Sequence, residues 1–210
     1  MTNFAKLTSW LIAAWLVLTL TASALHLYVN NPNDPPLPLG LAAITPLALF
    51  LVWFAVSKSF RQFTMSLNPR VLTWVQTWRI GGYVFLVLAA YRILPDSFAL
   101  PAGLGDMTIG ATAVFAGLKL AFPEHRKSFI AWQLLGMADL VAAIALGTLS
   151  RLIDPSGIST GPMTVLPMSF IPTFVVPLCL MLHVICIAQA TQWSAIPRTA
   201  IGQALQSPSA

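Results

Sequence analysis

The sequence predicts an all-α protein, a polytopic membrane bundle of six transmembrane helices with both termini in the cytoplasm. Three observations lead to this prediction. The 210-residue chain is 57% hydrophobic and only 8% charged, whereas a soluble domain carries roughly 25% charged residues. Six apolar stretches approach the length of about 20 residues that a helix needs to cross a bilayer. Lys and Arg also gather in alternate connections between these stretches, as expected of cytoplasmic loops.

The predicted spans follow one another with short connections and form a single domain over residues 1–210. They cover approximately residues 9–29, 39–56, 71–94, 106–122, 129–149 and 163–190, and a short cytoplasmic tail over residues 191–210 follows. Runs rich in Pro, Asn, Asp and Gly separate the spans, as turns require. The connections are too short to form a separate domain, so we expect function to lie within the bundle or at its mouths.

The first span has a second interpretation, as a signal peptide. Lys6, an apolar run and the small residues Ala22-Ser23-Ala24 resemble its charged, apolar and cleavage regions. The apolar run is longer than such a region normally is, so we expect a retained span.

Basic residues fix the predicted orientation. Only Arg92 and Arg151 fall on the predicted outer side. The predicted cytoplasmic side carries Lys6, Lys58, Arg61, Arg70, Lys119, Arg126, Lys127 and Arg198. This imbalance places both termini inside, as an even number of spans requires.

Two charged residues lie inside predicted spans, where an unpaired charge is costly. Arg79 lies roughly 12 Å into the third span, and Asp139 lies about 15 Å into the fifth, near the midplane. One interpretation is a functional pair, in which Asp139 binds a proton or solute and Arg79 is its counter-charge. The alternatives are that Arg79 extends to the lipid headgroups and that the pair only fixes helix register.

The sixth span adds a candidate polar layer at a similar depth. His183 is expected to lie beside Gln133 of the fifth span, and both are candidate ligand- or proton-binding neighbours of Asp139. Cys179 and Cys186 share the helical face of His183, and these three residues offer soft ligands for zinc or copper. A single helix seldom completes a metal site, so we predict no cofactor and expect a hydrogen-bonded histidine.

Asp106 opens the predicted fourth span. We expect it to cap this helix at the outer interface, and the functional alternative is an acid that guards the outer mouth. Gly110, Ala113 and Gly117 follow it on one helical face, and such a stripe of small residues predicts close packing against another helix.

Several classes of function find no signature in the sequence. The chain has a net charge of +5, but its basic residues are scattered over short loops, so no nucleic-acid partner is predicted. The phosphate-binding lysine loop, the metalloprotease His-Glu pair and the Gly-x-Ser-x-Gly nucleophile motif are missing from the sequence. An enzymatic function is therefore not favoured.

The segment Arg79-Ile80-Gly81-Gly82, followed by the motif LPxxFALPAGxGD over residues 94–106, resembles a group of uncharacterised small bacterial integral membrane proteins. The resemblance covers the third and fourth spans and implies a bacterial inner-membrane location. It also draws attention to residues 95–106, for which partial re-entry into the membrane is an alternative to a simple loop.

The function expected from these residues is proton-linked transport or binding of a small solute at a central polar site. The alternatives are a structural or assembly subunit of a membrane complex and a membrane-embedded enzyme. The expected partners are the lipid bilayer, a small-molecule solute, and either a second copy of the chain or another membrane subunit.

Overall fold

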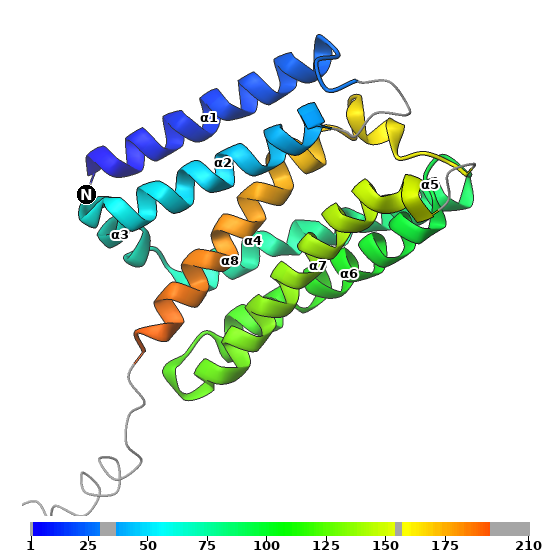
Figure 1. Cartoon of the computed structure of the whole chain (residues 1–210). Coiled ribbons are helices and arrows are strands. Elements are labelled where there is room, and N and C mark those ends of the chain that lie inside the picture. Colours follow the sequence, from blue (N-terminus) through cyan, green and yellow to red (C-terminus); the bar gives the residue numbers. More distant parts are fainter. Residues whose placement is uncertain (1, 30–36, 154–156, 194–210) are drawn as a thin grey trace, which may run out of the picture.

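A computed structural model of the chain describes residues 2–29, 37–153 and 157–193. Within them, six helical stretches are long and apolar enough to cross a membrane, and the described residues contain no strand. This confirms the predicted all-α membrane bundle (Figure 1). The predicted cytoplasmic tail from residue 194 onward, including Arg198, and residues 30–36 and 154–156 lie outside the described residues.

The first two spans are regular helices. The helix α1 covers Thr2–Ala24 and α2 covers Leu37–Val56. A short helix that we did not predict, α3 (Lys58–Met65), follows α2. Its start is capped by Ser57, whose Oγ accepts a hydrogen bond from the Phe60 amide at 3.2 Å, as helix N-caps commonly do. Phe60 stacks on Trp53 of α2, with ring centroids 3.7 Å apart, and this contact fixes α3 against the end of α2.

The third span changes its helical type in the middle. It runs through α4 (Pro69–Val75), the 3₁₀ helix η1 (Gln76–Gly82) and α5 (Tyr83–Ala90). The tighter winding of η1 places Gln76, Arg79 and Gly82 on one buried face, because residues three apart eclipse one another in a 3₁₀ helix. The local change in winding therefore determines where Arg79 lies.

The fourth span begins earlier than we predicted. The helix α6 covers Asp96–Phe115 and continues as the π-helical turn η2 (Ala116–Leu120). Residues 96–106 are thus the first half of a spanning helix, and neither a loop nor a re-entrant segment. Asp106 lies inside this helix and does not cap it. The predicted start at residue 106 was wrong because Pro101 lies inside α6, whereas proline usually marks the start of a helix or a kink within it.

The last two spans frame the core. The 3₁₀ turn η3 (Pro123–His125) leads into α7 (Arg126–Ile153), and the 3₁₀ turn η4 (Gly161–Thr164) follows. The sixth span consists of the π-helical turn η5 (Ile171–Val175) and α8 (Val176–Thr191). It starts at Ile171, later than the predicted residue 163. Pro167 lies between the two positions and lacks the amide proton that a regular helix needs.

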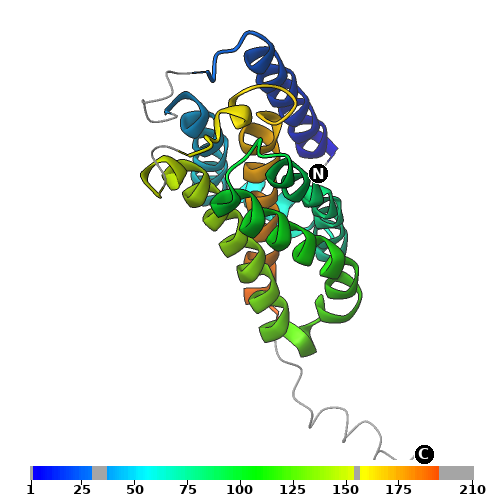
Figure 2. The same cartoon turned by 90° about the vertical axis from the view of Figure 1, so that its right-hand side faces the viewer.

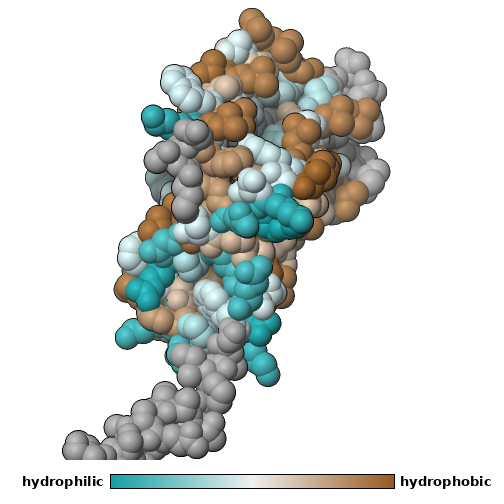
Figure 3. All heavy atoms as spheres, turned by 90° about the vertical axis from the view of Figure 1, so that its left-hand side faces the viewer, coloured by the Kyte–Doolittle hydropathy of each residue, from teal (hydrophilic) through white to brown (hydrophobic). Residues whose placement is uncertain are grey.

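Burial is uneven across the bundle. In the sixth span 56% of the residues in its most apolar window are buried, against 11% in each of the first two spans. The helix α8 accordingly lies in the middle of the bundle, with α1 and α2 towards one side and α6 and α7 towards the other (Figures 1 and 2). Hydrophilic residues gather near the end of the molecule where the chain leaves α8 (Figure 3).

Candidate functional site

Arg79 is the centre of a buried polar cluster. Arg79 is only 2% exposed, and its guanidinium extends from η1 towards α6, α7 and α8. The alternative that this side chain extends to the lipid headgroups is therefore wrong. A buried guanidinium needs partners for its five N–H donors. Groups on α6, α7 and α8 provide four such contacts.

Two carboxylates flank this guanidinium. The Arg79 Nε donates to Asp106 Oδ1 of α6 at 2.6 Å, and the Nη2 donates to Asp139 Oδ2 of α7. The predicted contact between Arg79 and Asp139 is thus present, and Asp106 joins it in place of its predicted position at the outer mouth. Both carboxylate side chains keep some exposure, 17% for Asp106 and 15% for Asp139.

The third nitrogen of Arg79 connects the carboxylates to His183. The Nη1 lies 3.4 Å from the Gly136 carbonyl oxygen and 3.4 Å from His183 Nε2. The other ring nitrogen, Nδ1, lies 2.5 Å from Gln133 Oε1. His183 is fully buried, so these two partners satisfy both of its nitrogens.

A chain of hydrogen bonds fixes the tautomer of His183. The Pro69 carbonyl can only accept, so Thr73 Oγ1 donates to it at 2.8 Å. The same hydroxyl accepts from Gln133 Nε2 at 3.1 Å, which leaves Gln133 Oε1 as the acceptor facing His183. The histidine therefore carries its proton on Nδ1 and presents an unprotonated Nε2 to Arg79. A proton on Nε2 would place two donors, Nε2–H and the Arg79 Nη1–H, against each other, and an unprotonated Nδ1 would face the Gln133 oxygen.

Glycines allow the helices to approach the cluster. A Cβ atom on Gly105 would collide with the Asp139 carboxylate, and one on Gly136 would lie 2.5 Å from His183 Cε1. On Gly82 it would lie 2.5 Å from Asp106 Cβ. The predicted close packing of the small stripe in α6 is also observed, since Gly110 abuts the backbone of Ile80. Because these positions carry no side chain, the helices can approach closely enough for the groups of the cluster to meet.

The cluster has an excess negative charge. One guanidinium faces two carboxylates, so the three side chains carry a formal charge of −1 when all are ionised. An uncompensated charge is expensive within the hydrocarbon layer. The arrangement can therefore bind one proton, or one cationic group, at the partly exposed carboxylates.

The metal site that the sequence offered is not assembled in the structure. No group of three or more His, Cys, Asp or Glu residues within the described ranges is placed to hold a metal ion. Both nitrogens of His183 face other partners, and Cys186 Sγ lies 4.0 Å from Thr73 Oγ1. Cys179 and Cys186 are free and buried.

One member of the cluster was not predicted. Thr73 links Gln133 to the backbone at the start of α4. Thr73, Gln76 and Arg79 follow one another at intervals of three residues, and this polar stripe in an apolar span was the available signal. The sequence offered no signal that Gly105 would contact Asp139, because that contact depends on how α6 and α7 pack.

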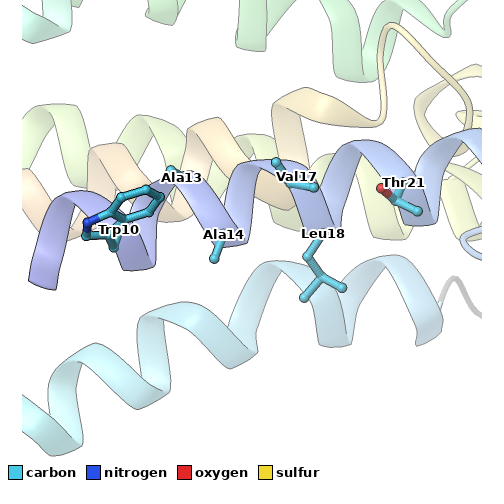
Figure 4. A pocket seen from close by; sticks show the side chains of 6 residues that line it. All are labelled: Trp10, Ala13, Ala14, Val17, Leu18 and Thr21. Atoms are coloured by element: carbon cyan, nitrogen blue, oxygen red, sulfur yellow. The ribbon is translucent and has the colours of Figure 1, made fainter.

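An apolar groove of about 520 Å³ lies away from this cluster, on the outer side of α1 (Figure 4). Six residues of α1 line it: Trp10, Ala13, Ala14, Val17, Leu18 and Thr21. It contains no titratable group, and its surface suits an acyl chain or a neighbouring helix. We therefore place the candidate site at Arg79 and its partners.

A family model described as a domain of unknown function, DUF8737, matches residues 36–191. The match includes Arg79, Asp106, Gln133, Asp139 and His183, whereas α1 lies outside it. No curated protein and no solved structure matches the chain. Because the matched region covers well over half of the sequence, this protein belongs to the DUF8737 family.

Proposed function

We propose that this membrane protein couples the binding or transport of a small solute to a proton held by Asp106 and Asp139. The observation that carries the proposal is that two carboxylates share one buried guanidinium. Taking up one proton neutralises the group, and losing it restores the negative charge. Intramembrane acids with this property commonly serve as proton relays in transporters.

The surrounding helices supply a means of coupling charge to shape. Arg79 lies on the 3₁₀ segment η1, and a 3₁₀ stretch within a helix is often a hinge. The guanidinium contacts three other helices, so a change in charge at either carboxylate alters the forces between η1, α6, α7 and α8. His183, Gln133 and Thr73 hold the guanidinium in register from the opposite side.

The test is proton movement in vesicles that contain the purified protein and an enclosed pH dye. Amines, carboxylates, sugars and amino acids are added outside, one class at a time. We expect one class to drive proton movement, and we expect Asp139→Asn and Asp106→Asn to abolish it. Asp96→Asn is the matched control, since Asp96 is 53% exposed and pairs with Arg92. Undiminished flux in both intramembrane variants would remove the carboxylates from the mechanism.

A structural or assembly role is the second candidate, and low burial of the first two spans favours it. Only 11% of the residues in their apolar windows are buried within the chain, which leaves a large surface for another subunit. In that role Asp139→Asn changes thermal stability or retention of a partner, and no solute class drives proton movement through the wild-type protein. A bacterial inner-membrane location is part of both proposals.

A further inference from the structure

A hollow with polar and apolar walls lies at the end of the bundle where α3 and α8 finish. It has a volume of about 300 Å³ and is lined by Met65, Leu67, Pro69, Gln189, Gln192 and Trp193. Met65 ends α3, Leu67 lies in the connection that follows, and Pro69 begins α4. The other three residues lie in the last turn of α8 and directly after it. The hollow does not include Arg79 or its carboxylates, so it is independent of the function proposed above.

Gln189 provides an unpaired acceptor in this hollow. The residue is 4% exposed, and its Nε2 donates to the carbonyls of Thr64, Met65 and Leu67 at 3.1, 3.3 and 2.8 Å. These three carbonyls fix the orientation of the amide, because the reverse orientation would press Oε1 against three other oxygens. The Oε1 is buried and has no hydrogen-bond partner within the described residues. An unpaired buried acceptor is costly and requires a donor.

The ends of two helices favour a positively charged donor. The C-terminus of α3 lies at Met65 and that of α8 at Thr191, and a helix C-terminus carries a partial negative charge. Such ends are usually complemented by Lys or Arg, yet neither helix has a basic residue in its last turn. Among the described residues, two nearby arginines contact other groups: Arg61 donates to the Ala55 carbonyl at 3.3 Å, and Arg70 lies over the Phe122 ring, 4.2 Å from its centroid.

We infer that this hollow binds a primary ammonium group, and that its source is the headgroup of phosphatidylethanolamine. The ammonium donates to Gln189 Oε1 and complements both helix ends. Met65, Leu67 and Trp193 provide apolar contacts for the glycerol region of the lipid, and Trp is typical of the depth at which headgroups lie. A free amine has the same recognition chemistry and is distinguished by the experiment below.

The experiment measures lipid retention by native mass spectrometry of the full-length protein taken from mixed vesicles. Phosphatidylethanolamine is compared with phosphatidylcholine, whose quaternary nitrogen has no N–H donor. We expect preferential retention of phosphatidylethanolamine and roughly a fivefold loss in Gln192→Lys, the scale of one hydrogen bond together with one helix-terminus charge. Gln192 is exposed, and a lysine there complements the end of α8, so this variant is expected to fold.

Two variants act as controls. Gln192→Glu adds a negative charge at the hollow and should increase retention. Ser97→Lys adds the same charge as Gln192→Lys at an exposed residue of α6 that neither lines the hollow nor lies at the end of α3 or α8, and it should leave retention unchanged. Displacement of the lipid by millimolar ethylamine would show that a free amine occupies the site equally well. Equal retention of both lipids in the wild type, or no effect of Gln192→Lys, would overturn the inference.

Discussion

The Nδ1 of His183 lies 2.5 Å from the Oε1 of Gln133, and this contact determines how Arg79 is held. The orientation of Gln133 is set by Thr73 and, through it, by the Pro69 carbonyl. Four groups from three spans, ending with His183, thus transmit one donor–acceptor order to the guanidinium. The neutral histidine accepts from Nη1 of Arg79, whereas the two carboxylates accept from Nε and Nη2.

The tautomer of His183 is therefore predictable. In nitrogen NMR spectra of protein labelled at histidine, we expect a protonated Nδ1 and an unprotonated Nε2. Gln133→Leu removes the acceptor that fixes this state and should cost about 1–3 kcal/mol of stability, the penalty for leaving a buried donor unpaired. Spectra that show a proton on Nε2 in the wild-type protein would contradict the hydrogen-bond order.

Loss of Arg79 should be the most destabilising single change in the cluster. Arg79→Met leaves two intramembrane carboxylates without a counter-charge, and breaking a buried ion pair in this way costs about 3–5 kcal/mol. Thermal unfolding in detergent measures the effect. The triple variant with Asp106→Asn and Asp139→Asn should recover much of the loss, since it removes the unpaired charges as well. A melting temperature for Arg79→Met equal to that of wild type would refute this.

The glycines that contact the cluster should tolerate a methyl group much less well than glycines with open space around them. In Gly105→Ala the new Cβ collides with the Asp139 carboxylate, and in Gly136→Ala it meets the His183 ring. We expect each to lose about 1–3 kcal/mol, as overpacked sites do. Gly40→Ala and Gly81→Ala are the controls, because nothing lies within 4 Å of a Cβ at either position. Equal melting temperatures in both groups would argue against the close approach.

Two helix ends carry a side chain in a conformation that favours glycine. His26 has φ of 56° and Arg92 has φ of 58°. Each follows a helix in a Schellman-type end, where the left-handed position is usually glycine. His26→Gly and Arg92→Gly should each stabilise the protein by about 1 kcal/mol, the typical cost of the left-handed conformation for a side chain. The same substitution at the exposed Ser97, which lies in α6, should destabilise it.

The orientation of the bundle follows from the basic residues and remains a prediction. Ser66 is exposed at the end of α3, and Ser97 is exposed near the start of α6. Cysteines introduced at these positions should react from opposite sides of the membrane. The native Cys179 and Cys186 are buried, so we expect them not to contribute to the labelling. A membrane-impermeant maleimide applied to right-side-out cells should label Ser97→Cys at once and Ser66→Cys only after permeabilisation. The reverse pattern would place both termini outside.

The sequence by itself determined the class of protein, because hydropathy and charge act over whole segments. A chain with 8% charged residues must place most of its surface against lipid, and backbone groups in lipid must form helices or closed barrels. It also identified Arg79, Asp139, His183 and Gln133, since a polar group within an apolar span is conspicuous wherever the neighbouring helices lie.

Only the tertiary structure decided which of these groups meet. Asp106 was expected at an outer helix end, and the packing of α6 against η1 and α7 brings it to the same guanidinium as Asp139. The unpaired Gln189 oxygen is likewise invisible in the sequence, because three carbonyls at and just after the end of α3 fix the orientation of one amide on α8. Hydropathy is a property of each segment, whereas hydrogen bonds between helices depend on rotation and depth, which are set by contacts between residues far apart in the chain.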